Sequence, residues 1–167
     1  MSAPRLLRAQ ALTAAAFAAF GDVVEADGHD SYPINQGTAR RYHDLARVDV
    51  SAQRGRAAIS LVRAQPQAPP LPLRLMERHP LASQAFMPLT PASFLVVVAP
   101  PGAAPGYGDL HAFVSNGRQG INYLQGVWHH PLIALHQVTD FLVVDREGPG
   151  SNCDEAAISD GEVTVAL

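Results

Sequence analysis

The sequence predicts a mainly β protein, a sandwich, jelly roll or closed barrel with one short helix near the N-terminus. Two observations support this class. The chain contains 13 glycines and 14 prolines, which leave few gaps long enough for a helix. The apolar runs between them are short and rich in β-branched residues, as in strands bounded by turns. No alternation of helices and strands indicates a parallel α/β sheet, so short strands joined by turns are expected.

The expected elements follow in chain order. Thr13 can cap a short helix that carries Phe17 and Phe20 on one face and ends at Gly21. Strands are expected at Arg41–Leu45, Ala57–Val62, Leu73–His79, Gln84–Pro88, Phe94–Ala99, Leu110–Val114, Leu132–Gln137, Phe141–Asp145 and Val163–Val165. Proline and glycine predict loops at Gln65–Pro72 and Ala99–Asp109. Since no repeat or clean linker interrupts the pattern, residues 1–167 are expected to form a single domain.

Composition limits the partners. Charged residues make up 16% of the chain, below the usual value of about 25%, which predicts a partly covered surface and a homodimer. The net charge is −3 and like charges form no long block, which argues against nucleic acid and membrane partners. All 12 basic residues are arginines, so no lysine can form a Schiff base, and arginine is the cation available to bind a carboxylate. The single cysteine, Cys153, predicts a reducing, cytoplasmic location.

Two segments resemble the halves of a cupin metal site, which reads His-x-His with a carboxylate about five residues on, and then Pro-x-Gly-x-x-His. The first segment is Glu77-x-His79 followed by Gln84, and the second is Leu124-x-Gly126-x-x-His129. The resemblance implies a cupin-like double-stranded β-helix, or jelly-roll barrel. Glu replaces a His, and the neutral Gln amide replaces an acid, which weakens the attraction for a divalent cation. No metal is required; if one binds, its ligands are Glu77, His79, Gln84 and His129.

Longer strings resemble the ureidoglycolate lyase family, from about Phe17 to the C-terminus. They are Arg41-Tyr42-His43-Asp44-Leu45-Ala46, Arg63-Ala64-Gln65-Pro66, Glu77-Arg78-His79-Pro80-Leu81, Gln84-Ala85-Phe86, Asn122-Tyr123, Val127-Trp128-His129-His130-Pro131-Leu132, Val138-Thr139-Asp140-Phe141-Leu142 and Ser151-Asn152-Cys153-Asp154. The resemblance implies a cupin-like homodimer that splits (S)-ureidoglycolate into glyoxylate and urea, late in allantoin and purine nitrogen breakdown. Nickel has been assigned to the family, although the pattern here does not demand it.

The chemistry that this resemblance implies needs three groups. A cation must hold the carboxylate, a base must take the hydroxyl proton, and an acid must protonate the leaving nitrogen. The sequence offers alternatives for each role. Arg63 and Arg41 are the candidate cations, His129 or His79 is the base, and Glu77 in an apolar setting is the acid. Further substrate contacts are expected from Gln84, Asn35, Tyr42 and His130.

Other functions stay open at this point. A hydrolase acting on a related ureido acid would release ammonia and carbon dioxide in place of urea. A non-catalytic cupin would bind a small ligand without turnover. A metal-dependent oxygenase would need iron and oxygen, against which the Glu and Gln replacements argue.

Overall fold

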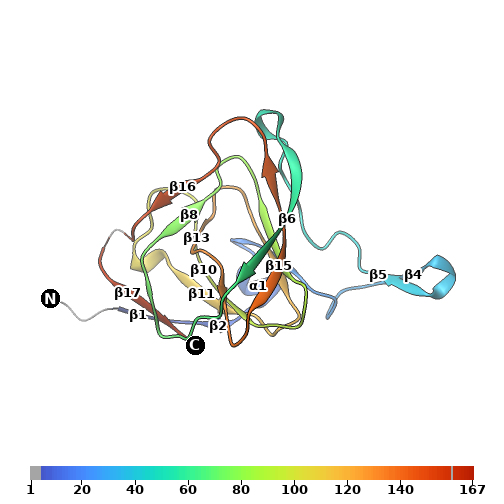
Figure 1. The fold of residues 1–167 in the computed structure, drawn as a ribbon, viewed down its shortest axis with the longest axis horizontal. Helices are drawn as coiled ribbons and strands as arrows, with labels where there is room; N and C mark the ends of the chain where they lie inside the picture. The colour runs from blue at the N-terminus through green and yellow to red at the C-terminus, as the bar shows by residue number, and fades with distance from the viewer. Residues whose placement is uncertain (1–4, 159) are drawn as a thin grey trace.

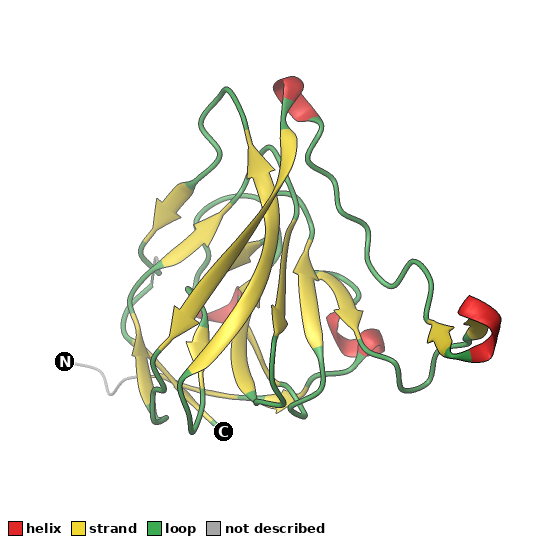
Figure 2. Cartoon of the chain, turned by 45° about the vertical axis from the view of Figure 1, so that its right-hand side comes forward, coloured by secondary structure: helices red, strands yellow, loops and turns green. Residues whose placement is uncertain are grey.

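The computed structural model describes residues 5–158 and 160–167, and these residues are mostly β-strand (Figures 1 and 2). One sheet consists of β1 (Arg5–Arg8), β17 (Val163–Ala166) and β7 (Leu71–Leu73). A second runs in the order β16 (Asp154–Ala156), β8 (Met76–Arg78), β13 (Trp128–His129), β10 (Phe94–Ala99), β11 (His111–Val114) and β2 (Gln10–Ala11), and β14 (Ile133–Ala134) also pairs with β10. We call the second the inner sheet.

A third sheet faces the inner sheet, and we call it the outer sheet. Its strands are β3 (Gly21–Val24), β12 (Gly120–Tyr123), β9 (Gln84–Pro88), β15 (Thr139–Glu147) and β6 (Arg56–Ala64), in that order. A separate hairpin pairs β4 (Tyr32–Ile34) with β5 (Ala39–Arg41). Short 3-10 turns lie at Asn35–Gly37, Ala52–Arg54 and Tyr107–Asp109.

The strand β10 explains how the layers are held together. It is an uninterrupted apolar run that is buried at every position, as expected for a strand covered on both faces. Its side chains alternate, so Phe94, Val96 and Val98 pack with the phenylalanines between the inner and outer sheets. Its other three side chains pack with Trp128 against the sheet that contains β7 and β17. The inner sheet is therefore the middle layer of three.

The predicted fold class is confirmed, since the chain is mostly β with one short helix. The helix α1 (Ala14–Phe17) is capped as expected, because the Ala16 amide donates to Thr13 Oγ1 over 3.2 Å. The two large sheets form separate hydrogen-bonded ladders. The architecture is thus that of a cupin-like sandwich and not of a closed barrel.

Several strands are shorter than the sequence predicts. The pairing expected over Arg41–Leu45 ends at Arg41, and Asp44 has a left-handed φ of 56° that an extended strand does not tolerate. The strand expected at Leu132–Gln137 is reduced to two residues, and His136 has a φ of 66°. Leu73–His79 is divided between β7 and β8, which belong to different sheets.

The β4–β5 hairpin, which follows β3 in the chain, projects from the sandwich (Figures 1 and 2). We call residues 29–46 the arm. The returning chain is fixed to the body by two hydrogen bonds, from the Arg47 amide to Asp22 and from Asn122 Nδ2 to the Arg47 carbonyl oxygen. The arm's own strands pair only with each other. No helix in the described part of the chain has the length and hydropathy needed to span a bilayer.

Candidate active site

A cavity of about 180 Å³ lies between the inner and outer sheets. Its polar wall comes from β8, β13 and the start of β9, and its apolar wall comes from β6, β9 and the segment after β13. It is lined by Val62, Glu77, Gln84, Phe86, Tyr123, His129, His130, Pro131 and Leu132. Four of the residues singled out in the sequence therefore line one cavity.

Strand geometry brings the ionisable groups of the cavity together. Glu77 and His129 are directly opposite in the antiparallel pair β8–β13, where facing side chains lie close. His79 follows Glu77 by two residues, and its ring centroid lies 5.1 Å from that of His129. One ligand-type atom from each of Glu77, His79 and His129 lies within 4.8 Å of the other two. This group of three forms the centre of the site.

A hydrogen-bond chain fixes the His79 ring. Its Nδ1 lies 2.7 Å from the carbonyl oxygen of Asn152, to which it donates, and its Nε2 lies 3.0 Å from Gln84 Oε1. Gln84 Nε2 in turn donates to Asp145 Oδ2 over 3.3 Å, which orients the amide with its oxygen toward His79. Both ring nitrogens of His79 therefore lie beside oxygen atoms, which fixes the orientation of the ring.

His129 is in a different state. It is buried, its ring stacks on Tyr123 with centroids 4.3 Å apart, and its Nδ1 donates to the Val127 carbonyl oxygen over 3.2 Å. Burial, together with the nearby His79, lowers the pKa of His129 to about 3. The ring is therefore neutral at ordinary pH, with the lone pair on Nε2.

The carboxyl group of Glu77 is half-buried. Burial raises its pKa above the ordinary value, although His79 opposes this shift. Burial also raises the pKa of Tyr123, with a contribution from Glu77, so the phenol keeps its proton. Glu77 is thus a carboxylate with an increased affinity for a proton.

His130 lines the cavity next to His129. Burial lowers its pKa, and its Nδ1 lies 2.8 Å from the Pro131 carbonyl oxygen, to which it donates. Its neutral ring can therefore offer Nε2 to a ligand as a hydrogen-bond acceptor.

The central group has the donor set of a metal site. Two imidazoles and a carboxylate suit a first-row divalent ion. His79 and His129 both direct Nδ1 at a backbone carbonyl oxygen, the arrangement that orients Nε2 toward a metal. Gln84 Oε1 lies beside His79 Nε2 and is placed as a further oxygen donor. The residues therefore fit a divalent metal, which Glu77, His79 and His129 would hold.

Arg63 lies outside the cavity. It precedes Ala64 on β6 and points to the face opposite Val62, where it makes a bidentate ion pair with Asp140 at 2.7 and 2.9 Å. Its side chain is 71% exposed. Its predicted contact with the substrate carboxylate stays a prediction, and this geometry does not favour it.

Three further predicted substrate residues lie on the arm. Asn35 is in the hairpin turn, Arg41 ends β5, and Tyr42 follows it. All three are exposed, and none lines the cavity of its own chain. The structure thus separates the predicted site residues into a cavity group and an arm group.

Sequence reasoning gave no role to three residues that shape the site. Tyr123 supports the His129 ring, Asp145 orients Gln84, and Asn152 anchors His79. Asp145 could have been found by period two, because it follows the buried Phe141 and Val143 on the same face of β15. The contact of Asn152 joins residues 73 positions apart and has no local signal.

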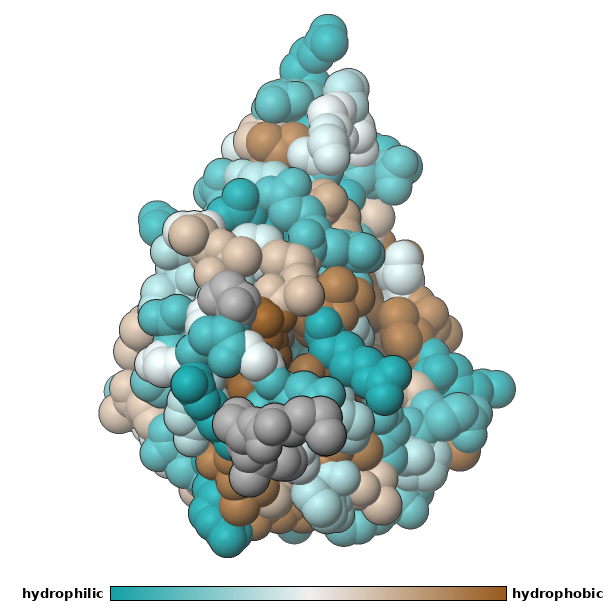
Figure 3. All heavy atoms as spheres, turned by 90° about the vertical axis from the view of Figure 1, so that its left-hand side faces the viewer, coloured by the Kyte–Doolittle hydropathy of each residue, from teal (hydrophilic) through white to brown (hydrophobic). Residues whose placement is uncertain are grey.

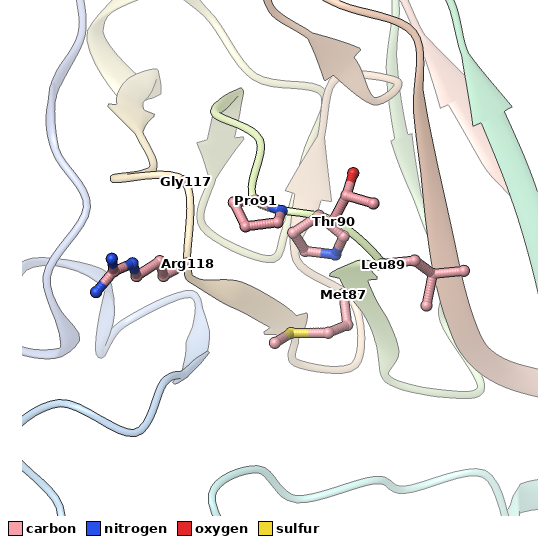
Figure 4. Close-up of a pocket in the computed structure, with 7 residues that line it drawn as sticks. Met87, Leu89, Thr90, Pro91, Gly117 and Arg118 are labelled. Carbon is pink, nitrogen blue, oxygen red and sulfur yellow. The ribbon is translucent and has the colours of Figure 1, made fainter.

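Another cavity lies at the opposite end of β9, between the Met87–Pro91 segment and the turn at Gly117 and Arg118 (Figure 4). The Arg118 side chain extends away from Met87 and Leu89 in this view. Its lining contains no histidine and no carboxylate. The cavity with Glu77 and the histidines is therefore the better candidate for chemistry.

Known proteins resemble this chain over almost its whole length. A family model described as ureidoglycolate lyase matches residues 4–166. A protein of Pseudomonas putida named ureidoglycolate lyase is 51% identical over 161 residues, which are 96% of each chain. Proteins of the same name from Azotobacter vinelandii and Stutzerimonas stutzeri are 51% and 54% identical, over 95% and 90% of this chain and 95% and 89% of theirs.

Proposed function

The chain belongs to the ureidoglycolate lyase family, and we propose that it splits (S)-ureidoglycolate into glyoxylate and urea in the cavity around Glu77. As a member of this family it is a lyase that acts on a small molecule. The observation that supports the proposed site is the grouping of Glu77, His79 and His129 beside one small cavity, which Glu77 and His129 line. The reaction moves one proton from the substrate hydroxyl to the leaving nitrogen while the carbon–nitrogen bond breaks.

Glu77 is placed to move that proton. Its raised pKa strengthens it as a base, and the anionic substrate beside it raises the pKa further. As a carboxylate it takes the hydroxyl proton while the aldehyde carbonyl forms. As a carboxylic acid it then returns the proton to the nitrogen, so that neutral urea leaves. This assignment combines the acid role expected of Glu77 with the base role expected of a histidine.

The histidines position the substrate in this proposal. His129, with a pKa of about 3, is a weak base, but its neutral Nε2 can accept a hydrogen bond from the substrate hydroxyl. His79 Nε2 lies 3.0 Å from Gln84 Oε1 and helps to fix the amide beside the cavity. The second lone pair of Gln84 Oε1 can accept from a ureido N–H group. These contacts hold the substrate with its hydroxyl toward Glu77.

A divalent metal such as nickel, if bound, would be held by Glu77, His79 and His129, with Gln84 as the further oxygen ligand. It would supply a Lewis acid for the oxygen atoms of the substrate. Both this arrangement and the direct one predict the same products.

Three further properties are proposed. A homodimer is supported by exposed apolar side chains on β6, where Ile59 is 73% and Leu61 66% exposed. One structural unit over residues 1–167 is supported by the pairing of β1 with β17, which joins the two ends of the chain. A cytoplasmic location is supported by the lone, exposed thiol of Cys153, which has no partner for an intrachain disulfide.

The test is the release of urea and glyoxylate from (S)-ureidoglycolate by the purified protein, with and without EDTA, against a control without enzyme. Equal amounts of both products, unaffected by EDTA, support direct chemistry by Glu77. Loss with EDTA and recovery with a divalent ion support the metal-bound arrangement. Ammonia as the primary nitrogen product would indicate the hydrolase instead, and stoichiometric binding without turnover would indicate a ligand-binding protein.

A further inference from the structure

The cavity lacks a cation for the carboxylate that the proposed function requires it to bind. None of its lining residues is an arginine, and the chain contains no lysine. Its one acidic residue, Glu77, repels an anion. A small carboxylate entering this cavity therefore needs a positive charge from elsewhere.

Three arginines of the body near the site are already engaged, and Arg74, three residues before Glu77, is exposed and does not line the cavity. Arg63 pairs with Asp140 on the other face of β6. Arg78 pairs with Asp154 over 2.8 Å, and its guanidinium carbon lies 4.7 Å from the Trp128 ring centroid. Arg146 donates to the carbonyl oxygens of Ala52, Gln53 and Pro149.

The arm offers an arginine that is not engaged. Arg40 is held by Ser31, to whose hydroxyl and carbonyl oxygens it donates over 2.9 Å. The next residue, Arg41, is exposed, and its side chain makes no ion pair or hydrogen bond with the residues that the structure describes. Neighbouring residues of a strand point to opposite faces, so Arg41 is directed away from Ser31. The arm itself projects outward from the body of its own chain (Figure 2).

The edge of the outer sheet offers a surface for the arm. Among the described residues, β6 pairs with β15 on one side and with no strand on the other, so its outward edge is open to another chain. Its exposed side chains include Ile59 and Leu61, on the outward face that also carries Arg63, and Val62, 39% exposed, on the inward face. Val62 also lines the cavity, so this open edge reaches the cavity wall. The arm carries matching apolar groups, with Tyr32 46% and Tyr42 37% exposed.

The opposite side of the molecule differs. Figure 3 shows that side as mostly hydrophilic, with hydrophobic residues interspersed. The strand β6 and the arm both lie on the other side of the molecule, at the right in Figure 1.

We propose that a second copy of this chain lays its arm across β6 and places its Arg41 at the cavity, where the guanidinium binds the substrate carboxylate. A two-fold dimer makes the exchange mutual, so each copy completes the site of the other. The role given to Arg41 rests on the proposed function, because it assumes an anionic substrate. The exchange of arms between the two copies does not depend on the identity of the substrate.

The test is complementation between two impaired chains, assayed at a substrate concentration well below the wild-type KM. Arg41→Ala removes the donated cation, and Glu77→Gln removes the catalytic carboxylate. The two chains are produced together with different affinity tags, and the mixed dimer is isolated. One of its two sites then combines an intact Glu77 with an intact Arg41 from the other copy, so the mixed dimer should recover about half of the wild-type activity per dimer.

The Arg41→Ala homodimer should show a KM raised by about tenfold or more, since a charge-assisted hydrogen bond to the carboxylate is lost. Arg41→Lys should restore part of the lost substrate affinity. Arg118→Ala is the matched control, an arginine outside the arm whose loss should leave KM unchanged. A mixed dimer with no more activity than the Arg41→Ala parent would overturn the exchange, because Arg41 would then serve its own chain. A monomeric wild-type protein in sedimentation would also overturn it.

A second measurement does not depend on activity. Arg41→Cys and Val62→Cys, combined in a Cys153→Ser background, should form a disulfide between two chains and give a covalent dimer on a non-reducing gel. Neither cysteine alone should do so. If the wild-type protein fails to cleave ureidoglycolate, the proposed function is wrong, and this cross-link still decides the exchange: a covalent dimer supports it and exclusively monomeric chain overturns it.

Discussion

The cavity and the arm are held in opposite ways. In the cavity, His79 is bonded to Asn152 and Gln84, Gln84 is bonded to Asp145, and His129 is stacked on Tyr123. The arm is held mainly by the pairing of β4 with β5 and by the contacts of Arg40 with Ser31. The cavity orients its side chains through contacts with the body, whereas the arm presents Asn35, Arg41 and Tyr42 without such contacts.

The comparison shows that two segments that carry the same family resemblance can lie in different parts of the structure. The Arg41-Tyr42-His43-Asp44 string and the Glu77-Arg78-His79-Pro80 string both carry the family resemblance, yet one lies on the projecting arm and the other in the cavity wall. If the reaction requires residues of the arm, we expect a second chain to fix the arm in place, because the body of its own chain does not. The following predictions test which residues of the cavity and of the body are needed for activity and stability.

The largest effect is expected from Glu77→Gln. The amide keeps the shape of the side chain but cannot accept and return a proton, so kcat should fall by about 100-fold or more. Initial rates of urea and glyoxylate release measure this. Glu155→Gln is the matched control, because Glu155 is paired with Glu77 across β16 and β8 but is exposed and does not line the cavity. A Glu77→Gln rate within a few-fold of wild type would move the proton transfer to a histidine or to a metal-bound group.

The pH dependence of the reaction should report the ionisation of Glu77. The reactive form of Glu77 is the carboxylate, and burial raises its pKa above the ordinary 4.5. In the wild-type protein kcat/KM should therefore fall as pH drops through a value above 4.5, by about tenfold per pH unit for one proton. The Glu77→Gln variant should lack this acidic limb. An acidic limb centred at or below 4.5 would contradict the role of Glu77.

A smaller effect, on stability, is expected from Arg146→Ala. Arg146 is 8% exposed and binds the carbonyl oxygens of Ala52, Gln53 and Pro149, where the chain has returned from the arm to the body. Gly55 allows this approach, because a Cβ at residue 55 would lie 2.3 Å from Arg146 Nε. The free energy of unfolding in urea should fall by about 2 kcal/mol. Arg118→Ala should change it by less than about 0.5 kcal/mol, and an equal loss in both variants would rule out a specific anchor.

The smallest effect is expected from Arg63→Ala. The side chain is exposed, bound to Asp140 and directed away from the cavity, and screened surface ion pairs contribute little. Neither the urea midpoint nor KM should change measurably, and Asp140→Asn should behave in the same way. A large rise in KM for Arg63→Ala alone would place the substrate carboxylate at β6 and remove the need for an arm from a second chain.

The sequence by itself determined the elements whose cause is local. The apolar run of β10, the Thr13 cap and the turn residues each act within a few positions, so the mainly β class and the short helix could be predicted. Period two also placed Glu77 and His79 on one face of the chain. The strings of the family were recognisable for the same reason, because each is a short contiguous segment.

Only the tertiary structure decided which of these segments meet. Glu77 faces His129, Gln84 is oriented by Asp145 from 61 residues away, and Arg63 faces Asp140 from 77 residues away. These contacts depend on strand register between distant segments, which local sequence does not encode. The state of each group was decided there as well, since burial lowers the pKa of His129 and raises that of Glu77. Burial is a property of the packed sheets, and identical residues in an extended chain would all titrate alike.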